Sequence, residues 1–291
     1  MDLGDYLGIS HGTIYKIIKL KNRHYRSYYI KKRDGRLRAI SSPRTFLKVI
    51  QWWINDTILS EFNPQKSVYG FVKGKSYIQN AQKHQGAAYI YNIDLRDFFP
   101  SITKNKARAA FQQFGYSEEV SEQLAEITTL NNELPQGAPT SPMLANIAFD
   151  ECDRHFGSFC AHHSITYSRY ADDLTFSSDF PIRELVKQEI NTIIVRFGFR
   201  VNENKIRYFT PNQRRYVTGL RLGKEHPGLD RKYLNSCRGW FHRILTNPNE
   251  HRSDLARLQG TVEHIKNVGG PGSQKILLIG EQAIISLSKN I

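Results

Sequence analysis

The segment YIYNIDLRDFFPSI, residues 89–102, contains a run of aromatic and β-branched residues that ends in a carboxylate, Asp94. Such a run is typical of a buried strand. Alternate side chains of a strand share one face, so Asp94 should lie with Ile90 and Asn92. A carboxylate at the end of an apolar strand is costly to bury unless it meets a cation. We therefore expect a cation site at this strand end.

A second group of carboxylates lies in SRYADDLTFS, residues 168–177. Two apolar-alternating arms flank Asp172 and Asp173, which predicts a hairpin with both acids at its tip. Alone, an Asp-Asp pair is more often a solvated turn. Adjacent carboxylates raise each other's pKa unless a multivalent cation compensates them. Together with Asp94 they would suit two Mg²⁺ ions about 4 Å apart, an arrangement that serves in-line displacement at a phosphate.

The charge of the chain indicates its partner. It has 291 residues and carries 41 Lys and Arg against 27 Asp and Glu, a formal net charge of +14. Twelve of these cations, and only one acid, Asp34, lie between Lys16 and Lys48. A polyanionic partner is the usual reason for such a field. A membrane surface is disfavoured because the stretch has no clean amphipathic apolar face, so we expect a nucleic acid.

The sequence contains no run of about 18 apolar residues and no secretory signal at its start. Its three scattered cysteines, Cys152, Cys160 and Cys237, predict neither a disulfide framework nor a zinc site. We expect a protein of the reducing cytoplasm with no membrane partner.

Periodicity predicts an α+β body followed by a small helical domain. Residues 5–20 indicate a helix, a turn and a helix; alone they resemble a DNA-reading motif, but a packed helical lead-in is favoured. The expected hairpin at residues 25–41 turns at Arg33, Asp34 and Gly35. The other expected helices are residues 45–62, 104–114, 117–130, 142–156, 182–197, 230–246, 251–267 and 273–289. Strands are expected at residues 87–95, 165–178 and 205–222.

Four blocks in sequence resemble the motifs of reverse transcriptases. NIDLRDFFPSI (92–102) resembles motif A, LPQGAPTSPMLANIAFD (134–150) motif B, RYADD (169–173) motif C and NENK (202–205) motif D. The resemblance spans nearly the whole chain. It implies the α+β right-hand polymerase fold, with an antiparallel palm sheet packed on helices. N-terminal helices and fingers would span residues 1–93, the palm with interleaved fingers helices 94–225, and the helical thumb 226–291.

The same resemblance assigns roles to single residues. Asp94, Asp172 and Asp173 would be the catalytic metal ligands for two Mg²⁺ ions, with the Leu95 carbonyl as a candidate further ligand. Hard oxygen ligands favour Mg²⁺ without excluding Mn²⁺. The residues that would bind the incoming dNTP are Arg38, with Lys31 or Arg36 as weaker candidates, the aromatic gate Phe99, Gln136 and Gly137 of the PQG turn, and Lys205. Otherwise Phe99 is a core aromatic, the PQG turn a rigid loop and Lys205 a surface lysine.

Two shorter blocks resemble elements of retron reverse transcriptases. Asn80 and His84 belong to NAQKH (80–84), and Val217, Thr218 and Gly219 form VTG. Alternatively, the first block is a helix end with a capping Asn and the second a strand-to-turn transition. The resemblance implies that both blocks bind nucleic acid. In the thumb, candidate contacts are Arg238 and Arg243, with Arg252 and Arg257.

A retron enzyme implies a set of partners. It would prime from an internal 2′-OH of a cognate structured non-coding RNA and copy part of it with dNTPs into a branched RNA–DNA hybrid, msDNA. Family members commonly work with an effector protein from the same operon in anti-phage defence.

Three other functions stay open. The first is a group II-intron-like or other bacterial reverse transcriptase with a different template, although the chain has no room for a maturase region. The second is a nucleic-acid-binding regulator with an inactive polymerase fold, which predicts a damaged site although all three aspartates are present. The third is template-independent nucleotide addition.

Overall fold

The computed structural model describes residue 4 and residues 7–31, 35–270 and 272–289. The chain divides into two compact units. The first comprises residues 1–74, 93–174 and 183–206, and the second comprises residues 75–92, 175–182 and 207–291. The predicted boundaries after residues 93 and 225 stay predictions.

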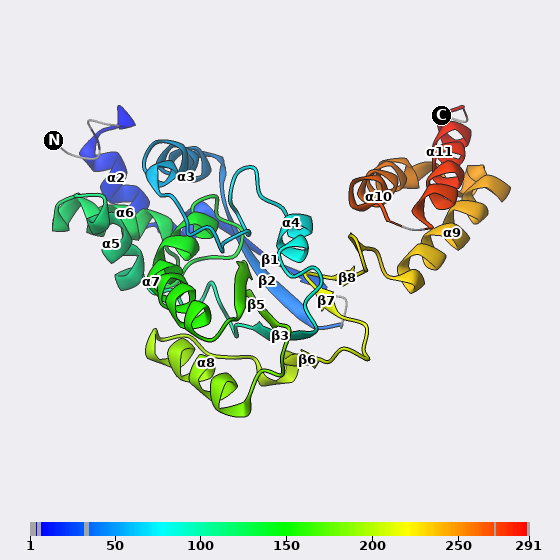
Figure 1. Cartoon of the computed structure of the whole chain (residues 1–291). Helices are drawn as coiled ribbons and strands as arrows, with labels where there is room; N and C mark the ends of the chain where they lie inside the picture. Colours follow the sequence, from blue (N-terminus) through cyan, green and yellow to red (C-terminus); the bar gives the residue numbers. More distant parts are fainter. Residues whose placement is uncertain (1–3, 5–6, 32–34, 271, 290–291) are drawn as a thin grey trace. The chain divides into compact units, whose positions relative to one another are not determined.

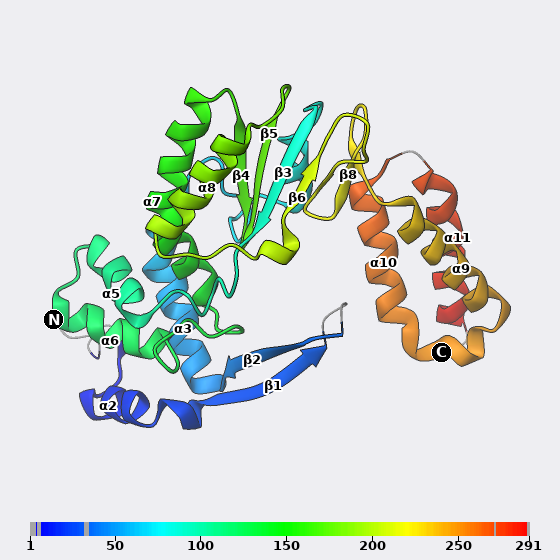
Figure 2. The same cartoon turned by 90° about the horizontal axis from the view of Figure 1, so that it is seen from below.

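The N-terminal part of the first unit is helical and then forms a hairpin. Helix α2 (His11–Lys19) begins where the Ser10 hydroxyl accepts a hydrogen bond from the Thr13 amide, an N-cap. Strands β1 (Tyr25–Lys31) and β2 (Leu37–Pro43) pair in antiparallel fashion, which confirms the predicted hairpin (Figure 2). Residues 32–34 lie outside the described residues, and so do residues 5–6 of the predicted lead-in.

Five further α-helices of the first unit lie among its described residues. They are α3 (Thr45–Thr57), α5 (Lys104–Gln113), α6 (Glu118–Thr128), α7 (Ser141–His162) and α8 (Glu184–Arg196). Helix α7 packs against α8 (Figure 1) and against strand β4 (Thr166–Tyr170) (Figure 2). It continues six residues beyond the predicted end at residue 156, because Cys160 on its last turns is buried in the core. Helix α3 is shorter than predicted and gives way to a 3₁₀ turn, Leu59–Glu61.

A four-stranded sheet has the strand order β4-β5-β3-β6. It contains β3 (Tyr89–Asp94), β5 (Asp173–Ser178) and β6 (Arg207–Phe209), and both β3 and β5 cross the boundary between the units. Strands β3 and β6 are antiparallel, with Ile90 opposite Phe209. Asp94 is therefore the last residue of β3, and Asp172 lies in the turn between β4 and β5.

The second unit combines short strands with a three-helix bundle. Helix α4 (Tyr77–Gln82) begins with a capping box formed by Ser76 and Gln79. A small antiparallel sheet contains β7 (Tyr216–Val217), β8 (Leu220–Leu222) and β9 (Pro227–Gly228). The bundle contains α9 (Arg231–Thr246), α10 (Leu255–Val268) and α11 (Ser273–Lys289), around a core that includes Phe241, Leu258 and Leu287. A 3₁₀ stretch, Pro248–Asp254, replaces the predicted first turn of α10.

Among the described residues, no helix has the length and apolar character that would be needed to span a membrane.

Candidate active site

Backbone hydrogen bonds bring three separate segments together at the end of β3. The Leu95 amide donates to the Asp172 carbonyl oxygen at 2.9 Å, and the Asn202 amide donates to the Asp94 carbonyl oxygen at 2.8 Å. Leu95 also forms an antiparallel bridge with Val201. The predicted proximity of Asp94 to the β4–β5 turn is therefore confirmed, although 78 positions separate Asp94 from Asp172 in the sequence.

The Asp94 carboxylate accepts two hydrogen bonds. Its Oδ1 accepts from Nδ2 of Asn202 at 3.0 Å, and its Oδ2 accepts from the ammonium of Lys205 at 2.7 Å. The side chain of Asp94 is 10% exposed and that of Lys205 is 42% exposed, so the ion pair lies at the edge of the protein interior. Lys205 thus contacts an acid of the predicted metal site directly.

The surroundings of Asp172 disfavour the ionised form of its carboxyl group. Burial raises the pKa of its carboxyl group above the ordinary value, and the negative charge of Asp94 raises it further. Lys205 and Arg38 act in the opposite direction, as cations that favour the charged carboxylate. Two acids that repel each other in a partly desolvated site are stabilised by a cation, so this donor set fits a divalent metal ion.

Asp173 is placed differently from the other two acids. It is the first residue of β5 and is exposed, and the cavity beside Asp94 and Asp172 has no lining contribution from it. Asp172 lies in the turn, directly after the left-handed residue Ala171, whereas Asp173 begins the strand, so the two side chains take different directions. Across the described residues, no three His, Cys, Asp or Glu side chains form a ready-made metal cluster. The assignment of Asp173 as a ligand stays a prediction.

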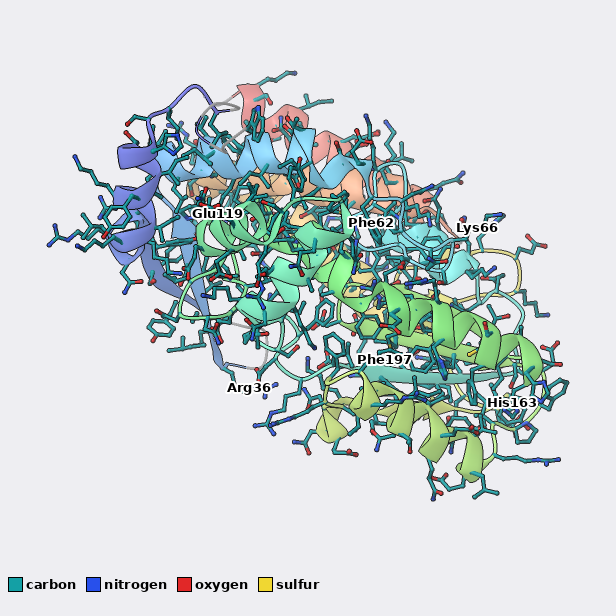
Figure 3. All side chains as sticks on the ribbon, turned by 90° about the vertical axis from the view of Figure 1, so that its left-hand side faces the viewer. Arg36, Phe62, Lys66, Glu119, His163 and Phe197 are labelled. Carbon is teal, nitrogen blue, oxygen red and sulfur yellow. The ribbon has the colours of Figure 1, made fainter. Side chains whose placement is uncertain are left out.

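A cavity of about 640 Å³ opens beside Asp94 and Asp172. Its lining includes Leu95 and four of the predicted nucleotide-binding residues: Arg38, Phe99, Gln136 and Lys205. Arg36 also lines the cavity and lies at the end of the β1–β2 hairpin (Figure 3). Lys31 is an exposed residue of β1 and does not contribute to the described lining. Carboxylates and cations both line the cavity, so it can hold a metal-bound polyphosphate.

Gly137 holds the PQG turn close to β2. The Gln136 carbonyl oxygen accepts a hydrogen bond from the Ser41 amide at 2.8 Å. Gly137 has a φ of +120°, and a Cβ there would approach Cγ2 of Ile40 to 2.9 Å and the Ser41 carbonyl oxygen to 3.2 Å. Only glycine fits both the backbone conformation and the close approach, so this residue positions Gln136 rather than contributing a side chain.

The sequence interpretation missed Phe71. This residue lines the same cavity, is 42% exposed and adopts a left-handed φ of 61°. Its ring lies 6.0 Å from that of Phe99 in a tilted arrangement. The only available signal was the glycine-rich context of Phe71, between Gly70 and Gly74, which is typical of a turn with special backbone angles.

The predicted nucleic-acid contacts lie in the second unit, and several are buried. Asn80 and Val217 are fully buried, and His84 is 1% exposed. The ring Nδ1 of His84 is hydrogen-bonded to the Ser177 hydroxyl at 2.7 Å, and burial, aided by Lys83, lowers the pKa of His84 to about 3. A direct contact with nucleic acid would require exposure of side chains that this unit buries.

Thr218, Gly219 and the thumb arginines are more accessible. The Thr218 hydroxyl donates to the Tyr77 carbonyl oxygen at 2.9 Å, and Gly219 is exposed with a φ of +80°. Arg238 and Arg243 are exposed on α9. Arg252 and Arg257 are exposed too, and the guanidinium of Arg257 lies 4.6 Å from the centre of the Trp240 ring. These assignments stay predictions.

Residues 30–227 match the family described as reverse transcriptase (RNA-dependent DNA polymerase). The chain is 33% identical over 280 residues to the Retron Ec86 reverse transcriptase of Escherichia coli, covering 95% of this chain and 86% of that one. It is 34% identical over 296 residues to the Retron Ec83 reverse transcriptase of the same species, covering 94% and 93%. It is 31% identical over 277 residues to the Retron Mx162 reverse transcriptase of Myxococcus xanthus, covering 83% and 57%.

Among solved structures, a telomerase from Candida albicans in complex with a fragment of telomeric RNA matches with a TM-score of 0.50 and 9% identity. The match covers 92% of this chain and 64% of the telomerase, and it shows a shared fold only.

Fold and site together define a template-copying nucleic-acid polymerase of the right-hand type. The chain belongs to the reverse transcriptase family, and within it to the retron reverse transcriptases. It is therefore an RNA-directed DNA polymerase, with an RNA template as its partner. Polymerases of this family generally use divalent metal ions.

Proposed function

We propose that this reverse transcriptase copies a cognate structured non-coding RNA into the DNA part of a branched RNA–DNA hybrid, msDNA, and that it acts with an effector protein in anti-phage defence. The similarity to several retron reverse transcriptases over almost the whole chain supports this proposal. The observation that carries the enzymatic part is the approach of Asp172 to Asp94 beside a cavity lined by cations.

Asp94 and Asp172 would hold the metal ions, with Asp173 as a further ligand. Two ions are proposed, Mg²⁺ in preference to Mn²⁺, because carboxylate oxygens are hard ligands. When bound, such ions supply an activated primer hydroxyl and neutralise charge on the leaving pyrophosphate. The raised pKa of Asp172 supports a bound cation, because burial and the charge of Asp94 both disfavour the ionised carboxylate.

The cavity residues would then select and orient the nucleotide. Arg38 would pair with phosphate oxygens through its planar guanidinium, which is suited to bidentate contacts. The Phe99 ring would exclude a ribose 2′-OH. Gln136, held against β2 by the turn at Gly137, would contact the incoming nucleotide. Lys205 would lose its hold on Asp94 when a metal ion binds and become available to the pyrophosphate.

The domain roles follow from these assignments. Residues 1–93 would form the N-terminal helices and fingers, residues 94–225 the palm, and residues 226–291 the thumb. The exposed arginines of α9 would contact the backbone of the bound duplex. Binding through phosphate contacts predicts a steep fall in RNA affinity with salt.

The central test combines a loss-of-site variant with a matched control. The double substitution Asp172→Ala and Asp173→Ala should abolish DNA synthesis while RNA binding persists. The control Asp179→Ala removes an exposed carboxylate directly after the last residue of β5 and should synthesise DNA at the wild-type rate. Substantial synthesis by the double variant would contradict the proposed site.

A second experiment tests the product. Nucleic acid that co-purifies with the protein from its own operon should contain a short DNA joined to RNA by a branch. A linear cDNA would instead support the group II-intron-like alternative. Addition of non-complementary dNTPs on a homopolymer template would support template-independent synthesis.

A further inference from the structure

Arg169, on β4 next to the β4–β5 turn, forms a buried ion pair with Asp153. The side chain of Arg169 is 0% exposed and that of Asp153, on α7, is 1% exposed. Nε of Arg169 donates to both carboxylate oxygens of Asp153 at 3.0 and 3.1 Å, and Nη2 donates to Oδ2 at 2.6 Å. The guanidinium also stacks 4.7 Å from the centre of the Phe149 ring.

The remaining nitrogen of this guanidinium is directed at the turn itself. Nη1 of Arg169 donates to the carbonyl oxygen of Ala171 at 3.1 Å and to Oδ1 of Asn146 at 3.1 Å. Ala171 immediately precedes Asp172 and has a φ of 57°, a left-handed conformation that is unfavourable for alanine. The Arg169 contact therefore restrains the residue whose backbone sets the direction of Asp172.

A second segment holds the same turn from another side. Nδ2 of Asn146 donates to the Gly70 carbonyl oxygen at 3.0 Å, and the Tyr69 amide donates to the Arg169 carbonyl oxygen at 2.8 Å. Gly70 lies so close to the turn that a Cβ would approach the Ala171 nitrogen to 2.3 Å. The left-handed turn is thus restrained from both sides by packed backbone and buried hydrogen bonds.

Stability alone does not account for a buried pair of this kind. Well-packed apolar residues of similar volume often stabilise a core as well as a buried ion pair does, because desolvation of two charges is costly. Here the arginine fork satisfies three different groups, and a lysine could not do so because its ammonium lacks the fixed planar geometry. The requirement for arginine lies in the contact with the turn.

We propose that Arg169 is a positioning residue of the polymerase: held by Asp153 and Asn146, it fixes the Ala171 carbonyl and so the placement of Asp172 relative to Asp94. This inference rests on the proposed role of Asp172 in metal binding. The link to Asp94 is the hydrogen bond from the Leu95 amide to the Asp172 carbonyl oxygen, which lies on the other side of the same turn. A turn that rotates would break this bond and separate the two carboxylates.

The test uses the full-length protein with Arg169→Lys, which keeps the positive charge and removes the fork. Hydrogen exchange of the Leu95 amide should become faster. The affinity of the RNA-free protein for Mn²⁺, measured from the electron paramagnetic resonance signal of the free ion, should fall by ~10- to 100-fold. Loss of a residue that orients a metal ligand usually has an effect of this size. The turnover number should fall, while KM for dNTP stays at the wild-type value.

Tyr167→Phe is the matched control within the same cluster. It removes a hydrogen bond from the tyrosine hydroxyl to Oδ1 of Asp153, 2.7 Å long, and leaves every contact with the turn in place. This variant should lower the melting temperature while leaving Leu95 exchange and Mn²⁺ affinity unchanged. Equal acceleration of Leu95 exchange in both variants would indicate general loosening of the core and would overturn the proposal.

Asn146→Ala covers the case in which Arg169→Lys fails to fold. It keeps the ion pair and removes the link between Arg169 and Gly70, so Leu95 exchange and Mn²⁺ binding should change in the same direction. Wild-type values of both in a folded variant would overturn the proposal. Failure of the proposed function is seen separately, as wild-type Mn²⁺ binding and DNA synthesis in Asp172→Ala.

Discussion

The ammonium of Lys205 lies 2.7 Å from Oδ2 of Asp94, in an ion pair that links the 3₁₀ turn Glu203–Lys205 to the end of β3. The same lysine lowers the pKa of Asp172, which burial and Asp94 raise. Lys205 is thus in contact with Asp94 and acts on Asp172 through its charge. A divalent ion and Lys205 would compete for the same carboxylate.

Replacement of Lys205 should change the pH dependence of DNA synthesis. Lys205→Met removes a charge that favours the ionised form of Asp172, so the pKa of Asp172 rises further. Metal binding requires the ionised form, and the acidic limb of the pH–rate profile should therefore move to higher pH. We expect several-fold lower synthesis at pH 6 relative to pH 8, with a modest effect because the lysine is partly exposed and screened.

Lys205→Arg supplies the control for this experiment, because it keeps the positive charge and should keep the acidic limb close to its wild-type position. Superimposable profiles for the wild type and Lys205→Met would contradict the electrostatic role. Rates measured by single-nucleotide addition at saturating dNTP would distinguish this effect from weaker nucleotide binding.

Asp172→Asn should stabilise the metal-free protein while abolishing synthesis. Because the pKa of Asp172 is raised in the folded state, the folded protein binds its proton more tightly than the unfolded chain does. The charged form therefore destabilises the fold at neutral pH, and this effect disappears in acid, below the ordinary value of 3.8. Each kcal/mol gained would raise the melting temperature by about 2–4 °C.

The pH dependence of this gain separates charge from packing. The melting temperature of Asp172→Asn should exceed that of the wild type at pH 7 without divalent ions, and the difference should vanish near pH 3. An equal difference at both pH values would show that the amide acts through its shape. Added Mg²⁺ should raise the melting temperature of the wild type more than that of the variant.

The position of Asp94 was predictable because a strand has a fixed period of two residues and the apolar run ends at a definite residue. The hairpin of β4 and β5 was predictable for the same reason. These local rules brought two carboxylates to the same sheet end, and the structure confirms this for Asp94 and Asp172. They did not separate Asp172 from Asp173, because the direction of each side chain depends on the left-handed residue Ala171.

Contacts between distant segments were outside the reach of sequence reasoning. Lys205 was predicted to bind the incoming dNTP, whereas its contact with Asp94 joins residues 111 positions apart. Arg169 belongs to the block that resembles motif C, but its complete burial depends on Asp153 on a neighbouring helix. Phe71, between Gly70 and Gly74, lines the cavity with a positive φ, and apolar periodicity does not predict such a backbone angle.

Phe99→Ala should weaken the discrimination against ribonucleotides. The Phe99 ring lines the cavity beside Asp94 and packs against Phe71, so its removal leaves room for a 2′-OH. We expect the ratio of kcat/KM for dNTP to that for rNTP to fall by ~10- to 100-fold, a range typical of a steric pocket contact. Phe71→Ala removes the neighbouring ring and should change the ratio less. An unchanged preference in Phe99→Ala would remove this residue from the gate role.

His84 should make the second unit sensitive to acid. Burial lowers its pKa to about 3 from an ordinary 6.5, so the folded protein keeps the ring neutral where the unfolded chain already binds a proton. Stability from this group is fully present above pH 6.5 and is lost as the pH falls towards 3, with a slope of at most about 1.4 kcal/mol per pH unit.

His84→Asn retains a partner for the Ser177 hydroxyl and removes the titrating ring. This variant should therefore melt at a lower temperature than the wild type at pH 7.5. Its melting temperature should fall less than that of the wild type on transfer to pH 5. The control His162→Asn, at an exposed site, should show the same change as the wild type. If His84→Asn and the wild type lost equal stability between these pH values, the acid sensitivity would have to come from other groups, because the protonation of His84 would then not be coupled to folding.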